Sequence, residues 1–163
     1  MSAPTSARDI ALFDRTTGKI EPLLHGLGFE IQARFSPGGR RIAYACNETG
    51  RWEVFVEPFP LTGQRDQVST DGGSQPVWRK DGAELFFVAP DGKLQSVTVG
   101  PGEAFAAGRP QLLFQTGMRP TYAPYPTTYD VSPDGQRFLI DTVRPETAPT
   151  ISIVTNWLAA SVR

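Results

Sequence analysis

The chain has 163 residues, of which 39% are hydrophobic and 20% charged, and its formal net charge is −1. This length suits one domain with a buried core, and the composition excludes both an intrinsically disordered chain and an integral membrane protein. Positive and negative residues are mixed along the chain with no basic stripe, so we expect no nucleic-acid partner. The single cysteine, Cys46, excludes an intrachain disulfide and a zinc site built from several cysteines.

The first residues, 1–8, lack the apolar stretch of a secretory signal, and no run of the sequence reaches the length of a membrane span. We interpret 1–8 as a disordered or linker segment and expect no membrane insertion. As written, the sequence is that of a cytoplasmic chain. A piece of a longer parent protein would look the same, so the parent's compartment, including an extracytoplasmic or membrane-anchored one, stays open.

Strand-like runs bounded by turn residues follow one another from residue 9 onward. They fall into four groups: 9–14 and 19–24; then 30–35, 40–46, 52–57 and 64–69; then 75–79, 83–88, 93–99 and 111–115; and last 127–132, 136–142 and 150–157. Residues 158–163 form a tail. No window shows a helical period over three turns, so we predict an all-β chain.

The first two runs of each of the last three groups share one motif, in which an apolar strand enters a tight turn and a second apolar strand leaves it. The turns are Ser36-Pro37-Gly38-Gly39, Arg79-Lys80-Asp81-Gly82 and Ser132-Pro133-Asp134-Gly135. Proline presets the negative φ of such a turn, and the final glycine accepts the positive φ that ends it. The turn glycines are 43 and 53 residues apart, a period typical of β-propeller blades.

We therefore predict a partial β-propeller of about three four-stranded antiparallel blades, with a half blade at the N-terminus. The expected units are a partial blade at 9–24 and blades at 30–69, 75–115 and 127–157. Sheet edges at both ends then need a partner. The initial strands complete the last blade of the same chain, or two copies pair head to tail in a six-blade ring, or a parent chain supplies the missing blades.

The repeated Phe-Ser-Pro-(Asp/Gly)-Gly-Arg pattern, followed by Ile42-Ala43-Tyr44 in the first copy, resembles the TolB-type, WD-like β-propeller repeat of bacteria. The resemblance runs from about residue 9 to 157. Segments 47–60, 129–135 and 155–157 are similar to the carboxy-terminal propeller of bacterial serine/threonine-kinase-like proteins. Related propellers precede the catalytic domain of prolyl-oligopeptidase-type peptidases. The resemblance implies a fold and an accessory role, and it departs from the family in length, because complete propellers of this kind usually have six or more blades.

No catalytic constellation is recognisable in the sequence. A kinase needs a glycine-rich loop and a His-Arg-Asp segment, and a hydrolase needs Gly-x-Ser-x-Gly. The nearest candidate, Gly72-Gly73-Ser74-Gln75-Pro76, lacks the final glycine. His25 is the only histidine, so a triad or metal cluster would depend on it alone. We expect a non-enzyme with no cofactor and no metal.

Strand direction alternates within a blade, so the turns between blades and the turns between second and third strands share one rim. The binding candidates on these turns are His25, Asn47, Asp71, Ser74, Arg119, Tyr122 and Tyr125. Segment 118–126 carries Arg, Tyr and Met, residue types suited to a contact surface, although it could equally be a plain connection between blades. We hypothesise that this rim makes the chain a non-catalytic module that binds a protein or docks a small ligand. The alternative is a regulatory segment of a kinase or peptidase.

Overall fold

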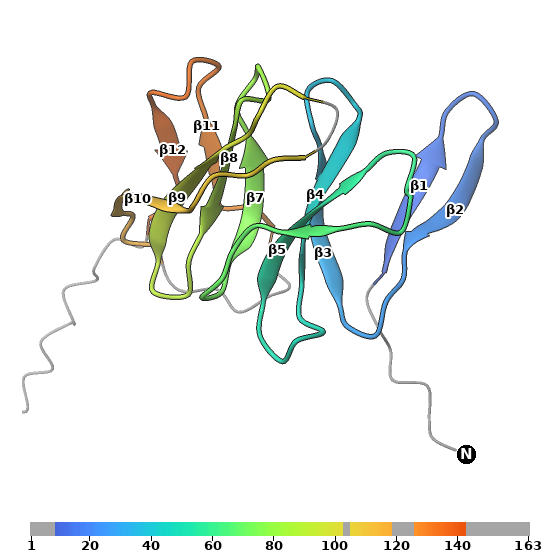
Figure 1. Cartoon of the computed structure of the whole chain (residues 1–163), viewed down its shortest axis with the longest axis horizontal. Coiled ribbons are helices and arrows are strands. Elements are labelled where there is room, and N and C mark those ends of the chain that lie inside the picture. Colours follow the sequence, from blue (N-terminus) through green and yellow to red (C-terminus); the bar gives the residue numbers. More distant parts are fainter. Residues whose placement is uncertain (1–8, 103–104, 119–125, 143–163) are drawn as a thin grey trace, which may run out of the picture.

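The computed structural model describes residues 9–102, 105–118 and 126–142, and these residues form twelve strands and no helix. The strands build four antiparallel sheets in chain order, and within each sheet every strand pairs with its neighbour in sequence. The sheets stand side by side in a row, with a two-stranded sheet at each end (Figure 1). The predicted all-β fold class is confirmed. Among the described residues the four sheets contain two, four, four and two strands in chain order.

We name the four sheets after the blades that they represent. The N-terminal half blade contains β1 (Ile10–Asp14) and β2 (Lys19–Leu24). Blade 1 contains β3 (Glu30–Phe35), β4 (Arg41–Cys46), β5 (Glu53–Pro58) and β6 (Asp66–Gln67). Blade 2 contains β7 (Ser74–Trp78), β8 (Glu84–Val88), β9 (Lys93–Thr98) and β10 (Gln111–Gln115). The C-terminal half blade contains β11 (Tyr129–Val131) and β12 (Phe138–Ile140).

Most strand bounds lie within a residue or two of the prediction, and the larger differences concern strand length. The run predicted at 64–69 is reduced to β6, although Val68 N still donates a hydrogen bond to Val54 O at 2.8 Å. The strands β11 and β12 are likewise shorter than the predicted runs 127–132 and 136–142. The predicted strand at 150–157, the linker 1–8 and the tail 158–163 lie outside the described residues.

The three tight turns have the backbone that their sequences predict. Gly39, Gly82 and Gly135 have φ values of +67°, +74° and +74°. The N–H of each donates a hydrogen bond to the carbonyl three residues earlier, at 2.8, 2.9 and 2.8 Å respectively. Because the turns are equivalent, the first two strands of blade 1, of blade 2 and of the C-terminal half blade pair in the same register next to the turn. Equivalent positions in successive sheets can therefore be compared directly.

Side chains from facing sheets form the core. Blade 1 places Ala43, Val54 and Val56 against Leu85 and Phe87 of blade 2. Since alternate residues of a strand point to opposite faces, the residues between them bury the other face of each blade. This explains the continuous apolar runs in β4 and β8, which are buried on both sides.

The outer faces of the two complete blades are covered by the half blades. Tyr44 and Phe55 of blade 1 pack with Leu24 of the N-terminal half blade. On the other side, the rings of Phe86 in blade 2 and Phe138 in the C-terminal half blade meet edge to face, with centroids 5.1 Å apart. Each sheet is thus packed against the next one along the row.

A repeated glutamine joins the first strand of each blade to the next. Gln32 and Gln75 both have φ of +58°, and each lies where the pairing of its strand shifts register. The side-chain oxygen of Gln32 accepts a hydrogen bond from Gln75 N at 2.8 Å. The side-chain oxygen of Gln75 accepts one from Thr128 N at 2.7 Å. The contact spans 43 residues in one case and 53 in the other, as the turn glycines do.

Candidate interaction face

One rim of the structure is built from the turns that enter each blade and the turns between its second and third strands. Asn47 Oδ1 accepts a hydrogen bond from Phe29 N at 2.8 Å, and Gly73 N donates one to Trp52 O at 2.8 Å. Thr116 N donates to Gly92 O at 3.2 Å in the next sheet. We call this surface the loop rim and define it as residues 25–29, 47–52, 69–74, 89–92 and 116–118. Its two kinds of turn lie together, as the alternation of strand direction requires.

The sequence candidates occupy different positions on this rim. His25 and Asp71 are exposed, Asn47 is half-buried and holds a neighbouring loop, and Ser74 is half-buried at the start of β7. The structure brings Asn47 to the loop that contains His25, through Phe29 N. Arg119, Tyr122 and Tyr125 lie outside the described residues. A binding role for all seven candidates remains a prediction.

A buried carboxylate organises the middle of the loop rim. Glu53 is 1% exposed and accepts hydrogen bonds from Arg51 Nε at 2.5 Å, from Gly72 N at 3.1 Å and from the Ser69 hydroxyl. Arg51 Nη2 also donates to Thr70 O at 2.5 Å. Because a buried charge is costly unless it is paired and hydrogen-bonded, these donors offset the loss of hydration. The network holds loop 69–73 in place, and its only signal in the sequence is a glutamate at the start of a mainly apolar strand.

A second buried carboxylate supports the loop before β3. Glu30 is 3% exposed, and its Oε1 accepts a hydrogen bond from Gly26 N at 3.2 Å and contacts Cys46 Sγ at 3.7 Å. Its other oxygen is buried with no hydrogen-bond partner among the residues described. Burial, followed by the charge of Glu30, raises the pKa of the Cys46 thiol to about 11. Cys46 is fully buried, and in such an environment a thiol packs as a small hydrophobic group.

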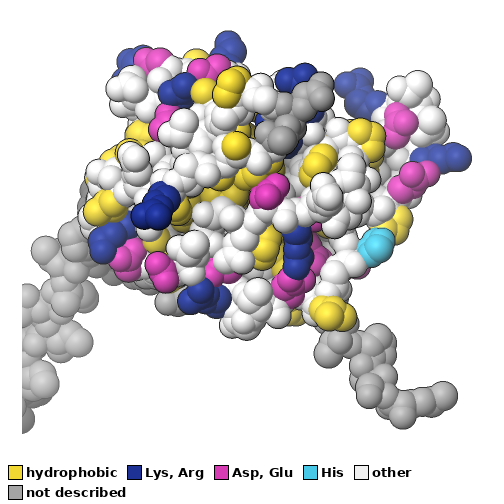
Figure 2. Space-filling view, in the orientation of Figure 1, with side chains coloured by type: hydrophobic (Ala, Val, Ile, Leu, Met, Phe, Trp, Pro, Cys, Tyr) yellow, Lys and Arg dark blue, Asp and Glu magenta, His cyan; other side chains and the backbone are white. Residues whose placement is uncertain are grey.

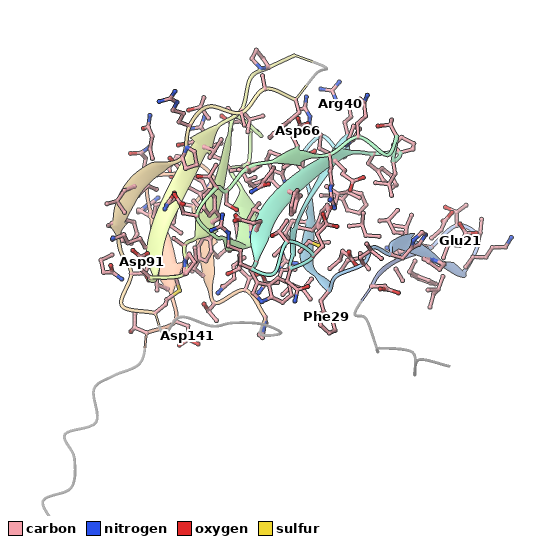
Figure 3. All side chains as sticks on the ribbon, turned by 60° about the horizontal axis from the view of Figure 1, so that its bottom comes forward. Glu21, Phe29, Arg40, Asp66, Asp91 and Asp141 are labelled. Atoms are coloured by element: carbon pink, nitrogen blue, oxygen red, sulfur yellow. The ribbon has the colours of Figure 1, made fainter. Side chains whose placement is uncertain are left out.

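The same loop presents two large apolar side chains to solvent. Leu27 is fully exposed and Phe29 is 38% exposed. Figure 3 shows Phe29 pointing away from the sheets. The backbone beneath them is held by Glu30 and Asn47, and Gly28 approaches Glu48 so closely that a Cβ would lie 2.6 Å from its amide nitrogen. We call His25, Leu27 and Phe29 the Leu27 patch. Sequence reasoning named only His25, although the alternation Gly26-Leu27-Gly28-Phe29 was visible.

Neither charge nor metal-binding groups mark out a site among the described residues. Figure 2 shows basic and acidic side chains interspersed over the visible face rather than gathered by sign. Within the part of the chain that the structure covers, no three His, Cys, Asp or Glu side chains are grouped so that they could hold a metal ion. Residues 9–102, 105–118 and 126–142 include no helix with the length and hydropathy of a membrane span.

No family model matches the chain, and no curated protein matches it. Among solved structures it is similar to a TolB-type protein from Agrobacterium tumefaciens, with a TM-score of 0.55 and 19% identity, over 83% of this chain and 51% of that one. It is also similar to TolB from Acinetobacter baumannii, with a TM-score of 0.50 and 18% identity, over 88% of this chain and 45% of that one. The fold is a partial TolB-like β-propeller.

The chain spans about half the length of the TolB structures that it resembles. At this level of identity the likeness concerns the fold alone. The resemblance to TolB-type repeats is therefore confirmed at the level of architecture. The link to kinase-like proteins, and that to peptidases, stay predictions from the sequence.

Proposed function

We propose that this chain is a non-catalytic β-propeller module that binds a protein partner through the loop rim. The observation that carries the proposal is the Leu27 patch. It exposes a leucine fully and a phenylalanine partly, on a loop whose backbone is hydrogen-bonded to the side chains of Glu30 and Asn47. The partial propeller fold supports it, because loops carried on a rigid scaffold are the usual place for recognition.

The physical case rests on preorganisation. Gly26 N and Phe29 N are already hydrogen-bonded to the side chains of Glu30 and Asn47, so the loop loses little conformational freedom when it binds. Fully burying an exposed leucine side chain contributes about 1.5–3 kcal/mol, and Phe29, which is 38% exposed, contributes a smaller amount. Two such side chains on one loop supply the apolar centre that protein interfaces usually have.

A protein partner suits this rim better than a small polar ligand. Two polar side chains that support the rim are engaged within the chain: Glu53 binds Arg51 and Gly72 N, and Asn47 binds Phe29 N. In addition to exposed polar residues such as Asp71, the rim offers apolar area outward at the Leu27 patch. We therefore infer a partner surface with an apolar depression that receives Leu27 and Phe29.

The proposal is tested by placing a photo-crosslinking amino acid at position 27 and, as a matched control, at position 17. Thr17 lies in the exposed turn between β1 and β2, outside the loop rim. We expect a discrete crosslinked partner from position 27 only, and its loss when Phe29 is changed to Ser. Equal crosslinking from both positions, or a partner that is retained by Phe29→Ser, would contradict the proposal.

A further inference from the structure

The sequence contains four Asp-Gly pairs, at residues 71–72, 81–82, 91–92 and 134–135. In such a pair the glycine nitrogen can attack the side-chain carbonyl carbon of the aspartate, because glycine has no side chain to hinder a close approach. All four aspartates are exposed, and all four glycines have a positive φ, between +74° and +95°. Since the pairs agree in sequence, exposure and glycine backbone, a difference in reactivity between them comes from their contacts.

In three of the pairs the turn itself engages the aspartate. Oδ1 of Asp81, Asp91 and Asp134 accepts a hydrogen bond from the backbone N–H two residues later, at 3.0, 3.2 and 3.0 Å respectively. Each carboxylate also has a side-chain partner, which in the same order is Arg79, Lys93 and Ser132. These contacts hold each carboxylate in one direction and favour its ionised form.

The same contacts make these three pairs unreactive. The hydrogen bond from Arg79 lowers the pKa of Asp81 to about 2. The pKa of Asp91 is lowered by the Lys93 side chain, and that of Asp134 by the Ser132 hydroxyl. An ionised carboxylate resists a nucleophile, because it has no hydroxyl group that can leave as water. The three glycine N–H groups are occupied as well, since each donates to the carbonyl three residues earlier, at 2.8–2.9 Å.

Asp71 and Gly72 lack these contacts. Among residues 9–102, 105–118 and 126–142, the Asp71 side chain has neither a hydrogen bond nor an ion pair. Gly72 N donates to a carboxylate, that of Glu53, at 3.1 Å to Oε2 and 3.2 Å to Oε1. Glu53 is 1% exposed, at the start of β5. The Asp71 carboxyl group is therefore free to turn towards Gly72 N, and the hydrogen on that nitrogen faces a base.

We propose that Asp71 is the site at which the native chain converts spontaneously to isoaspartate. Gly72 N attacks Cγ of Asp71 while the Asp71 carboxyl group is protonated. The hydrogen on Gly72 N passes to Glu53 and then joins the departing hydroxyl, so that one water leaves and a five-membered succinimide ring forms. A water molecule then opens the ring at the backbone carbonyl, and the peptide bond to Gly72 now runs through the Asp71 side chain. The two steps release one water and take up one water.

The modification changes the loop rim beside Glu53. The succinimide nitrogen carries no hydrogen, so Gly72 no longer donates to Glu53, which keeps Arg51 Nε and the Ser69 hydroxyl as donors. Isoaspartate also lengthens the backbone of the loop that enters β7 by one carbon atom. The site is separate from the Leu27 patch and goes beyond the proposed function, so either can fail without the other.

The first test ages the complete chain for several weeks at neutral pH and compares the four pairs. Tryptic digestion followed by electron-based fragmentation in a mass spectrometer distinguishes isoaspartate from aspartate. Peptide 66–79 contains Asp71 and none of the other three Asp-Gly pairs. We expect isoaspartate to accumulate several-fold faster at Asp71 than at any of the other three aspartates. Equal rates, or a faster rate at one of those three, would overturn the proposal.

Ageing the chain in urea is the control for local sequence. In the unfolded chain all four pairs lose the contacts described above, so we expect their rates to converge. If Asp71 leads by the same factor in urea, its reactivity comes from the neighbouring residues in sequence and the structural explanation is wrong.

Two matched variants and one further variant complete the test. Asp71→Glu should remove most of the isoaspartate of the native chain, because a glutamate would have to form a less favourable six-membered ring. Asp134→Glu, at an equally exposed aspartate, should leave the amount unchanged. Glu53→Gln keeps the shape of the acceptor and removes its basicity, so we expect a slower reaction at Asp71. An unchanged or faster reaction in a Glu53→Gln chain that still unfolds cooperatively would contradict the role given to Glu53. The comparison of the four pairs in the unaltered chain needs no variant.

Discussion

Replacing Gln75 with methionine tests whether the repeated glutamine contact holds adjacent blades together. Gln75 is 1% exposed, and its side-chain oxygen accepts hydrogen bonds from Thr128 N at 2.7 Å and from the Thr128 hydroxyl at 3.0 Å. Methionine has a similar length and volume and no strong acceptor. It also keeps the backbone strain at φ +58°, since it is no better suited than glutamine to a positive φ. The change therefore isolates the hydrogen bonds from cavity and backbone effects.

The expected cost follows from these two bonds. A typical hydrogen bond contributes about 0.5–1.5 kcal/mol net, and a buried donor left without a partner costs about 1–3 kcal/mol. Thr128 is half-buried, so water replaces part of what is lost. We expect Gln75→Met to lower the free energy of unfolding by about 2 kcal/mol, a large share of the roughly 5–15 kcal/mol of a typical domain.

Urea unfolding followed by tryptophan fluorescence measures this change. The midpoint should fall while the slope with denaturant stays the same, because the surface exposed on unfolding is unchanged. Gln111→Met is the matched control: Gln111 is exposed on β10, and we expect an effect within about 0.5 kcal/mol. A Gln75→Met variant as stable as this control would refute a structural role for the glutamine contact.

Three further predictions concern the turns and the titratable groups. Gly135→Val should destabilise by about 1 kcal/mol or more in thermal unfolding, because φ is +74° there, whereas Gly38→Val, at a residue without a positive φ, should have a smaller effect. The hydrogen bond from Arg79 lowers the pKa of Asp81 from 3.8 to about 2, so its contribution to stability is present above pH 3.8 and is lost as the pH falls towards 2. Asp81→Asn should flatten the dependence of the melting temperature on pH in that window, and an unchanged slope would contradict this. Cys46 should resist alkylation at neutral pH until the chain unfolds, because burial keeps its thiol protonated and inaccessible, and rapid labelling of the native protein would be evidence against the buried position.

The repeat architecture was predictable because its causes are local. Pro133 and Gly135 determine a turn by their own backbone preferences, and the apolar runs on either side of it determine strands. The 43- and 53-residue spacing then places equivalent turns in successive sheets. Strand ends were less accurate where few neighbours support a strand, as in β6 and in the C-terminal half blade.

The position of the loop rim could be predicted from the sequence, but only some of its exposed residues could. The alternation of strand direction was enough to group His25, Asn47, Asp71 and Ser74 on one side. The exposed apolar residues of the rim, Leu27 and Phe29, were missed. The local sequence does not reveal that hydrogen bonds from their loop to Glu30 and Asn47 fix its backbone. An exposed apolar residue and a core residue look alike in sequence.

By itself, the sequence determined the all-β class, the order of the strands and the positions of the tight turns, since each depends on residues close together in the chain. Only the tertiary structure decided which polar groups became buried, as with Glu53 and Gln75, because their partners come from other strands and other blades. It also decided which apolar side chains stay exposed at the two ends. Phe35 and Trp78 occupy equivalent positions, and Trp78 is buried because it packs against the four-stranded blade 1, whereas Phe35 is half exposed.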